Sequence, residues 1–82
     1  MADDRLRADV VAAWVNGVLA DYAGRYEVVD HLFVRDAVRV VTVRRDAFFD
    51  IPRQRWVGDS DAERHADMGE ELRLWARRVM PS

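Results

Sequence analysis

Apolar residues recur at helical spacing in the first part of the chain. Four of them follow one another at intervals of four, three and four residues: Val11, Val15, Val18 and Tyr22. This spacing puts them on one face of a helix, with polar or small residues on the other face. The pattern predicts a helix over residues 4–23 that ends before Gly24, since glycine is common just past a helix end. Inside that range, we interpret Gly17 as permitting a close approach to the sheet.

Three short runs rich in β-branched and aromatic residues come next: residues 26–34 (YEVVDHLFV), 37–44 (AVRVVTVR) and 47–51 (AFFDI). Arg-Asp-Ala stands between them twice, at residues 35–37 and 45–47. Aspartate tolerates turn conformations and bonds to nearby backbone. We therefore predict a three-stranded antiparallel meander, with a three-residue loop at residues 35–37 and a two-residue turn at Arg45 and Asp46. Pro52 ends the third strand.

The last segment carries the signals of a helix start. Ser60 followed by Glu63 fits a capping box. Five residues then recur at spacings of three and four: His65, Met68, Leu72, Trp75 and Val79. The order is thus α-β-β-β-α, which predicts an α+β fold in one compact domain over residues 1–82. Two amphipathic helices usually cover one face of such a sheet, and we expect both to pack there.

The predicted turns give the sheet two apolar faces. One face collects Tyr26, Val28, Leu32, Val34, Val38, Val40, Thr42, Phe49 and Ile51. The other collects Val29, His31, Phe33, Arg39, Val41, Val43 and Phe48, together with Asp50. With both helices on the first face, the second face exposes an apolar patch of the kind that marks an interaction site. We expect Val41→Asp to release a partner and leave the chain folded.

Two alternatives stay open at this point. One helix could cover each face and leave no patch exposed, and a two-residue first turn would mix the two faces. If the patch is exposed, a second copy of the chain or a different protein could cover it. A core this small gives little net stability, and the chain has no cysteine, so a second subunit is a plausible support.

The segment PRQRW, residues 52–56, is predicted to be a loop. Arg53, Arg55 and Trp56 are residue types common at protein interfaces, and they also suit phosphate contacts and base stacking. The alternative is that Trp56 folds back into the core, as large aromatic side chains of small domains mostly do.

Composition narrows the setting of the protein. All thirteen basic residues are arginine, which fits the codon usage of a GC-rich bacterial or phage genome. The net charge is −2, and residues 25–57 carry seven arginines against five acidic residues, so positive charge gathers on the sheet segment. No apolar run could span a bilayer, and the charged N-terminal residues do not read as a signal peptide, so the expected location is cytoplasmic.

Candidate chemistry is sparse. His31 and His65 lack a carboxylate at a useful spacing, and no metal, nucleophile, phosphate-loop or dinucleotide motif occurs. We therefore expect a protein that is not an enzyme and holds no metal or cofactor, with each histidine packed and hydrogen-bonded.

The order of the elements resembles that of double-stranded-RNA-binding domains. That resemblance implies duplex binding through a basic cluster at the start of the last helix. Here residues 59–67 read DSDAERHAD, which is acidic and would repel phosphate. The RNA-binding residues of that family therefore do not carry over to this chain.

These observations favour a protein-binding module, such as a small bacterial regulator or a phage-type inhibitor of a host protein complex. The expected contact residues are Val29, Phe33, Arg39, Val41, Val43, Phe48, Arg53, Arg55 and Trp56. The alternative is a nucleic-acid-binding domain that uses the basic residues of the sheet and loop: Arg39, Arg44, Arg45, Arg53 and Arg55, with Trp56.

Overall fold

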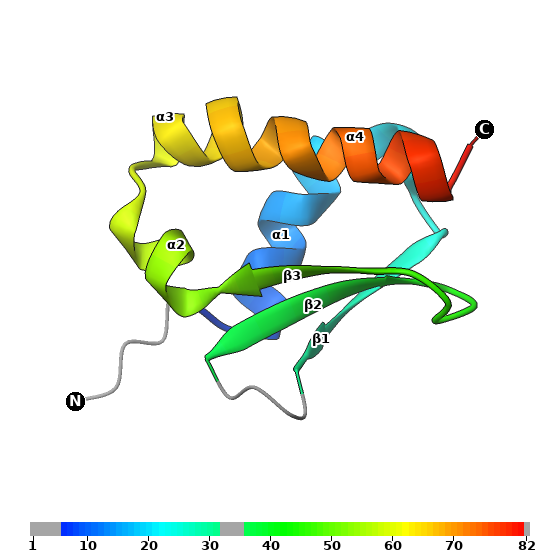
Figure 1. Cartoon of the computed structure of the whole chain (residues 1–82), viewed down its shortest axis with the longest axis horizontal. Helices are drawn as coiled ribbons and strands as arrows, with labels where there is room; N and C mark the ends of the chain where they lie inside the picture. The colour runs from blue at the N-terminus through cyan, green and yellow to red at the C-terminus, as the bar shows by residue number, and fades with distance from the viewer. Residues whose placement is uncertain (1–5, 32–35, 82) are drawn as a thin grey trace.

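The structure is a computed structural model of the 82-residue chain, and it describes residues 6–31 and 36–81. The three strands form an antiparallel sheet in the order β1-β2-β3, so the predicted α+β meander is confirmed (Figure 1). The elements in chain order are α1 (Ala8–Val18), the 3₁₀ turn η1 (Ala20–Tyr22), β1 (Tyr26–Asp30), β2 (Ala37–Thr42), β3 (Phe48–Pro52), α2 (Arg53–Gly58), α3 (Asp61–Glu63), the π-helical turn η2 (Arg64–Met68) and α4 (Gly69–Val79).

Helix α1 is shorter than the predicted range of residues 4–23. Its C-terminal end comes at Val18, because Leu19 leaves the helical region with φ −106° and ψ 38°. The predicted start at residue 4 lies outside the described residues. The apolar face is largely as expected, and its fully buried positions are Val11, Val15 and Leu19.

The sheet register differs from the predicted one by an even number of residues at both turns. Asp30 pairs with Val38, where the three-residue loop would have placed Val34 opposite Val38. Val41 pairs with Phe48, two residues away from the register of a two-residue turn. Side chains alternate between faces with a period of two, so even shifts leave every residue on its predicted face. The face assignment is therefore confirmed for the paired strand residues, while Leu32, Phe33 and Val34 lie outside the described residues and Val43 lies in the loop after β2.

The second Arg-Asp-Ala copy does turn the chain, but in a loop of five residues, 43–47, between β2 and β3. Arg45 adopts a left-handed conformation with φ 60°, and its N–H donates to the Thr42 carbonyl at 2.8 Å. The hydroxyl of Thr42 donates to Oδ1 of Asp46 at 2.6 Å, so a side-chain hydrogen bond also closes the loop. In the first copy Arg35 lies outside the described residues, and Ala37 already belongs to β2.

Both α1 and α4 pack on the same face of the sheet, as predicted (Figure 1). The strand residues Val38, Val40 and Ile51 are buried there in one cluster with side chains from both helices. At the edge of this cluster the ring of Phe49 lies 6.0 Å from that of Trp75. The other face of the sheet, which we call the outer face, points away from the two helices.

The final helix runs through α3, η2 and α4. Its start is the predicted capping box: the Ser60 hydroxyl accepts from the Glu63 N–H at 3.2 Å, and the Glu63 carboxylate accepts from the Ser60 N–H at 3.0 Å. The π turn follows, and the Gly69 N–H donates to the Arg64 carbonyl five residues back. A π turn inserts one residue into the helical repeat, so the side chains before it are rotated about the helix axis relative to those after it.

Close approach between helices occurs at Gly69 and not at Gly17. A Cβ added to Gly69 would lie 3.7 Å from Cγ2 of Val18 and 3.8 Å from Cζ2 of Trp14, whereas one added to Gly17 would meet nothing within 4 Å. The expected role of Gly17 is therefore wrong. Gly24, past the end of the helical region, adopts φ 83°, which glycine tolerates without steric cost.

Within residues 6–31 and 36–81, no helix has both the length and the apolar character needed to cross a membrane.

Candidate functional site

Arg39 lies at the centre of the outer face. It sits in the middle strand, with Val29 beside it on β1 and Asp50 beside it on β3. The next row of the same face joins Glu27, Val41 and Phe48 across the three strands. The position of these side chains on one face follows from strand alternation, because residues two apart in a strand share a face.

The guanidinium of Arg39 is held by a carboxylate and a histidine. Its Nε donates to Oδ1 of Asp50 at 2.6 Å and its Nη2 donates to Oδ2 at 3.0 Å, which is a bidentate pair. Nη2 also lies 2.5 Å from Nε2 of His31, which accepts a hydrogen bond when that nitrogen is unprotonated. The hydrogen bond with Asp50 raises the pKa of Arg39, against the opposing effect of desolvation, so the residue keeps its charge.

An aromatic ring completes this cluster. The guanidinium carbon of Arg39 lies 3.9 Å from the centroid of the Phe48 ring, a cation–π contact. Phe48 nevertheless keeps 55% of its surface exposed. A ring that is both exposed and held in position is a suitable anchor for a partner, because little conformational entropy is lost when it is covered.

Val41 is not part of an exposed patch, contrary to expectation. Only 6% of its surface is exposed, although it lies on the outer face. Longer side chains around it, those of Arg39, Arg45 and Phe48, line the same hollow and leave Val41 at its floor. Val29 is half-buried and Val43 is 54% exposed, in the turn after β2. Three members of the expected patch, Val29, Val41 and Phe48, therefore line one hollow, while Phe33 lies outside the described part of the chain.

A hollow of about 180 Å³ opens beside Phe48. Its apolar lining comes from Val29, Val41 and Phe48, and its polar lining comes from Asp30, His31, Arg39 and Arg45. Asp30 was not expected at this site, and Arg45 was expected only as part of the alternative nucleic-acid-binding surface. Arg45 belongs to the turn after β2, as expected, and its Nη2 reaches Oε2 of Glu27 at 2.8 Å.

Most arginines of the sheet region are paired with carboxylates. The pairs are Arg39–Asp50, Arg45–Glu27, Arg53–Asp36 and Arg55–Glu71. Among the described residues Arg44 has no ion-pair partner. Such pairing removes much of the positive field that a polyphosphate chain would meet. Nucleic-acid binding remains a prediction, and the arrangement of charges counts against it.

Trp56 is a core residue and not a loop residue. It belongs to the short helix α2, has 5% of its surface exposed and stands edge-on to Trp14 with ring centroids 5.6 Å apart. The guanidinium carbon of Arg64 lies over the Trp56 ring, 4.5 Å from its centroid, and Arg64 also donates to the Trp56 carbonyl oxygen. Trp56 was expected to contact a partner, but it packs in the core instead. Arg53 and Arg55 of the same helix remain partly exposed.

The two histidines have different environments. The side chain of His31 is almost fully buried beside Asp50, whose Oδ2 lies 3.6 Å from Nε2. His65 is exposed, but it stays on the side of the helix that faces α1, where its ring lies 6.2 Å from that of Trp14. In the part of the chain that the structure describes, no three His, Asp or Glu side chains group as metal ligands.

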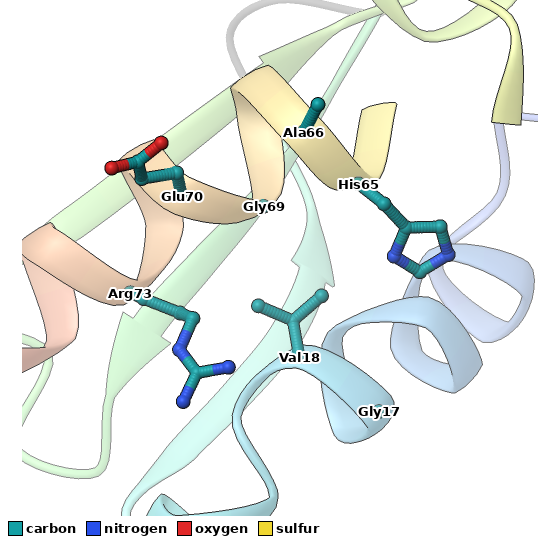
Figure 2. Close-up of a pocket in the computed structure, with 7 residues that line it drawn as sticks. All are labelled: Gly17, Val18, His65, Ala66, Gly69, Glu70 and Arg73. Atoms are coloured by element: carbon teal, nitrogen blue, oxygen red, sulfur yellow. The ribbon is translucent and has the colours of Figure 1, made fainter. Parts of the chain in front are cut away.

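A second hollow runs between α1 and the final helix, with a volume of about 310 Å³. Its lining residues are Gly17, Val18, His65, Ala66, Gly69, Glu70 and Arg73. Figure 2 shows His65 and Arg73 toward its two ends, on either side of Val18, while Glu70 points away. Polar groups do not converge here as they do around Arg39, so the outer face is the better candidate for a binding site.

Comparisons with protein-family models, with curated proteins and with solved structures find no match to this chain. The resemblance to double-stranded-RNA-binding domains stays one of element order.

Proposed function

We propose that this chain is a non-enzymatic protein-binding domain that holds its partner against the outer face of the sheet. The observation that carries this proposal is Phe48, an exposed aromatic side chain fixed by Arg39 at the edge of a hollow. Aromatic and arginine side chains at the centre of a face are the residues that dominate protein interfaces.

The rest of the outer face suits this role. Arg39 is oriented by Asp50 and His31 before any partner arrives, so its remaining donors are pre-organised. The charges on the face are mixed and locally paired, which favours a defined protein surface over a polyanion. A regulator or an inhibitor of a protein complex, acting in the cytoplasm, would work by such an interface.

Substitution of the anchor tests the proposal. Wild-type chain, Phe48→Ser and Leu74→Ser are immobilised and used to capture proteins from a lysate of the host organism. Leu74 is the matched control, because it is 54% exposed on α4, away from the outer face. We expect one protein to be retained by wild type and by Leu74→Ser and lost by Phe48→Ser. Equal retention by all three chains would contradict the proposal.

A further inference from the structure

The hollow beside Phe48 combines an apolar wall with unevenly distributed charge. Val29, Val41 and Phe48 supply the wall. The polar groups that face it are basic except for one: His31, Arg39 and Arg45 against Asp30. The carboxylates that neutralise the two arginines, those of Asp50 and Glu27, are not among its lining residues. An occupant therefore meets an apolar wall and cationic donors.

Arg39 has donor capacity left for that occupant. Its Nε and Nη2 bond to Asp50, and Nη2 also contacts His31. No hydrogen-bond partner of its Nη1 lies among the described residues. Asp50 thus holds the guanidinium along the edge formed by Nε and Nη2. The N–H groups of Nη1 remain for an acceptor on the occupant. Guanidinium and carboxylate groups pair with a strength and a directionality that neutral acceptors do not match.

The charges indicate one carboxylate and not a chain of phosphates. Each arginine of the face already has a carboxylate beside it, so the face offers local donors without a strong positive field. Polyphosphate binding draws its free energy from that field and from the release of many counterions. A single acidic side chain needs only one pre-organised donor. Its binding therefore depends less on a positive field than the binding of a polyphosphate does.

We infer that the hollow accepts a segment of a partner protein in which an acidic side chain neighbours a large apolar side chain. The carboxylate accepts hydrogen bonds from Nη1 of Arg39, and the apolar side chain packs on Phe48 and Val29. This inference rests on the proposed function and adds the chemistry of the partner to it.

Selection from a random peptide library tests the inference without knowledge of the partner. Phage displaying random twelve-residue peptides are selected on immobilised wild-type chain, and peptides that also bind Phe48→Ser are discarded. We expect the recovered peptides to share Asp or Glu next to Leu, Phe, Trp or Met. Synthetic peptides with that acid changed to its amide should bind roughly tenfold more weakly, the loss typical of a strong interface contact.

Three protein variants complete the design. Arg39→Gln should weaken binding by about as much as the acid-to-amide change, and Arg39→Lys by less, because lysine keeps the charge without the planar fork. Leu74→Ser should bind like wild type. The amide peptides leave the protein itself unchanged, so the test holds even if a variant at Arg39 is unstable.

Other outcomes overturn the inference in distinguishable ways. Peptides that need Phe48 but show no acidic residue, or tolerate its amide, remove the acidic partner and leave the proposed function standing. If no recovered peptide needs Phe48, both proposals fail. A dimer that Phe48→Ser converts to monomer assigns the face to a second copy. Salt-sensitive binding of a single-stranded oligonucleotide that is lost in Arg39→Gln, with no acidic peptide recovered, assigns it to nucleic acid.

Discussion

Arg39 and Phe48 form a stacked pair in the middle of the outer face, with 3.9 Å between the guanidinium carbon and the ring centroid. Two Asp50 oxygens hold the same guanidinium at 2.6 and 3.0 Å. Carboxylate, guanidinium and ring therefore behave as one unit that lies across the strands. Any substitution in it alters both the anchor and the donor of the candidate site.

Arg39 and Asp50 should show measurable coupling in a double-mutant cycle. We expect Arg39→Ala, Asp50→Ala and the double variant to give an interaction free energy of about 1 kcal/mol in urea unfolding. The pair is bidentate and shielded by Phe48, but it remains partly exposed, which keeps the value small. The Arg45–Glu27 pair is the control: both side chains are more exposed, and its coupling should stay below about 0.5 kcal/mol.

Val41→Asp should unfold the chain and not simply release a partner. Val41 lies at the floor of the hollow with 6% of its surface exposed, so an ionised carboxylate there would be desolvated. We expect the free energy of unfolding to fall by at least about 2 kcal/mol, measured by urea denaturation followed by circular dichroism.

Val43→Asp is the matched control for that experiment. Val43 lies two residues further along the chain and is 54% exposed, so its substitution should change stability by less than about 0.5 kcal/mol. Comparable stability of the two variants would show that Val41 is accessible to solvent and that the packing of the outer face is looser than described.

The loop between β2 and β3 contains Asp46, a carboxyl group whose pKa is lowered. The hydrogen bond from the Thr42 hydroxyl lowers the pKa of Asp46, with smaller support from its own backbone N–H and from the charge of Arg44. A lowered pKa in the folded state stabilises the fold above the unfolded value of about 3.9. That contribution is lost as the pH falls through the lower, folded value.

A Thr42→Val variant tests this assignment. The hydroxyl donor is lost, so the pKa of Asp46 should rise toward its ordinary value, and a carbon-13 NMR titration of the carboxyl group measures it directly. Asp46→Asn should remove the corresponding loss of stability in acid. If the pKa of Asp46 is the same in wild type and Thr42→Val, the hydroxyl is not its cause.

Sequence patterns predicted the faces of the elements better than their ends. Residues such as Val15 and Val40 fell on their predicted sides because helical and strand periods are local properties of the chain. The even register errors preserved this result. Burial of Val41 was not predictable, because it depends on where long side chains such as those of Arg39 and Arg45 come to lie.

Trp56 shows the second limit of such patterns. Helix α2 has six residues, fewer than two turns, so its sequence carries no periodic signal. The contact that buries Trp56 comes from Trp14 in a distant part of the chain.

Gly17→Ala should stabilise the chain. Gly17 is helical, and a Cβ there would have no neighbour within 4 Å, so alanine adds helix propensity without a clash. We expect a gain of roughly 0.5 to 1 kcal/mol in the free energy of unfolding.

Gly24→Ala is the opposite case, because φ is 83° and a Cβ strains that backbone whatever the space around it. It should destabilise by about 1 kcal/mol, so the two variants should differ in sign in the same urea experiment. A loss of stability in Gly17→Ala would mean that another molecule or segment approaches α1 closely at that point, on the side where the hollow of Figure 2 opens.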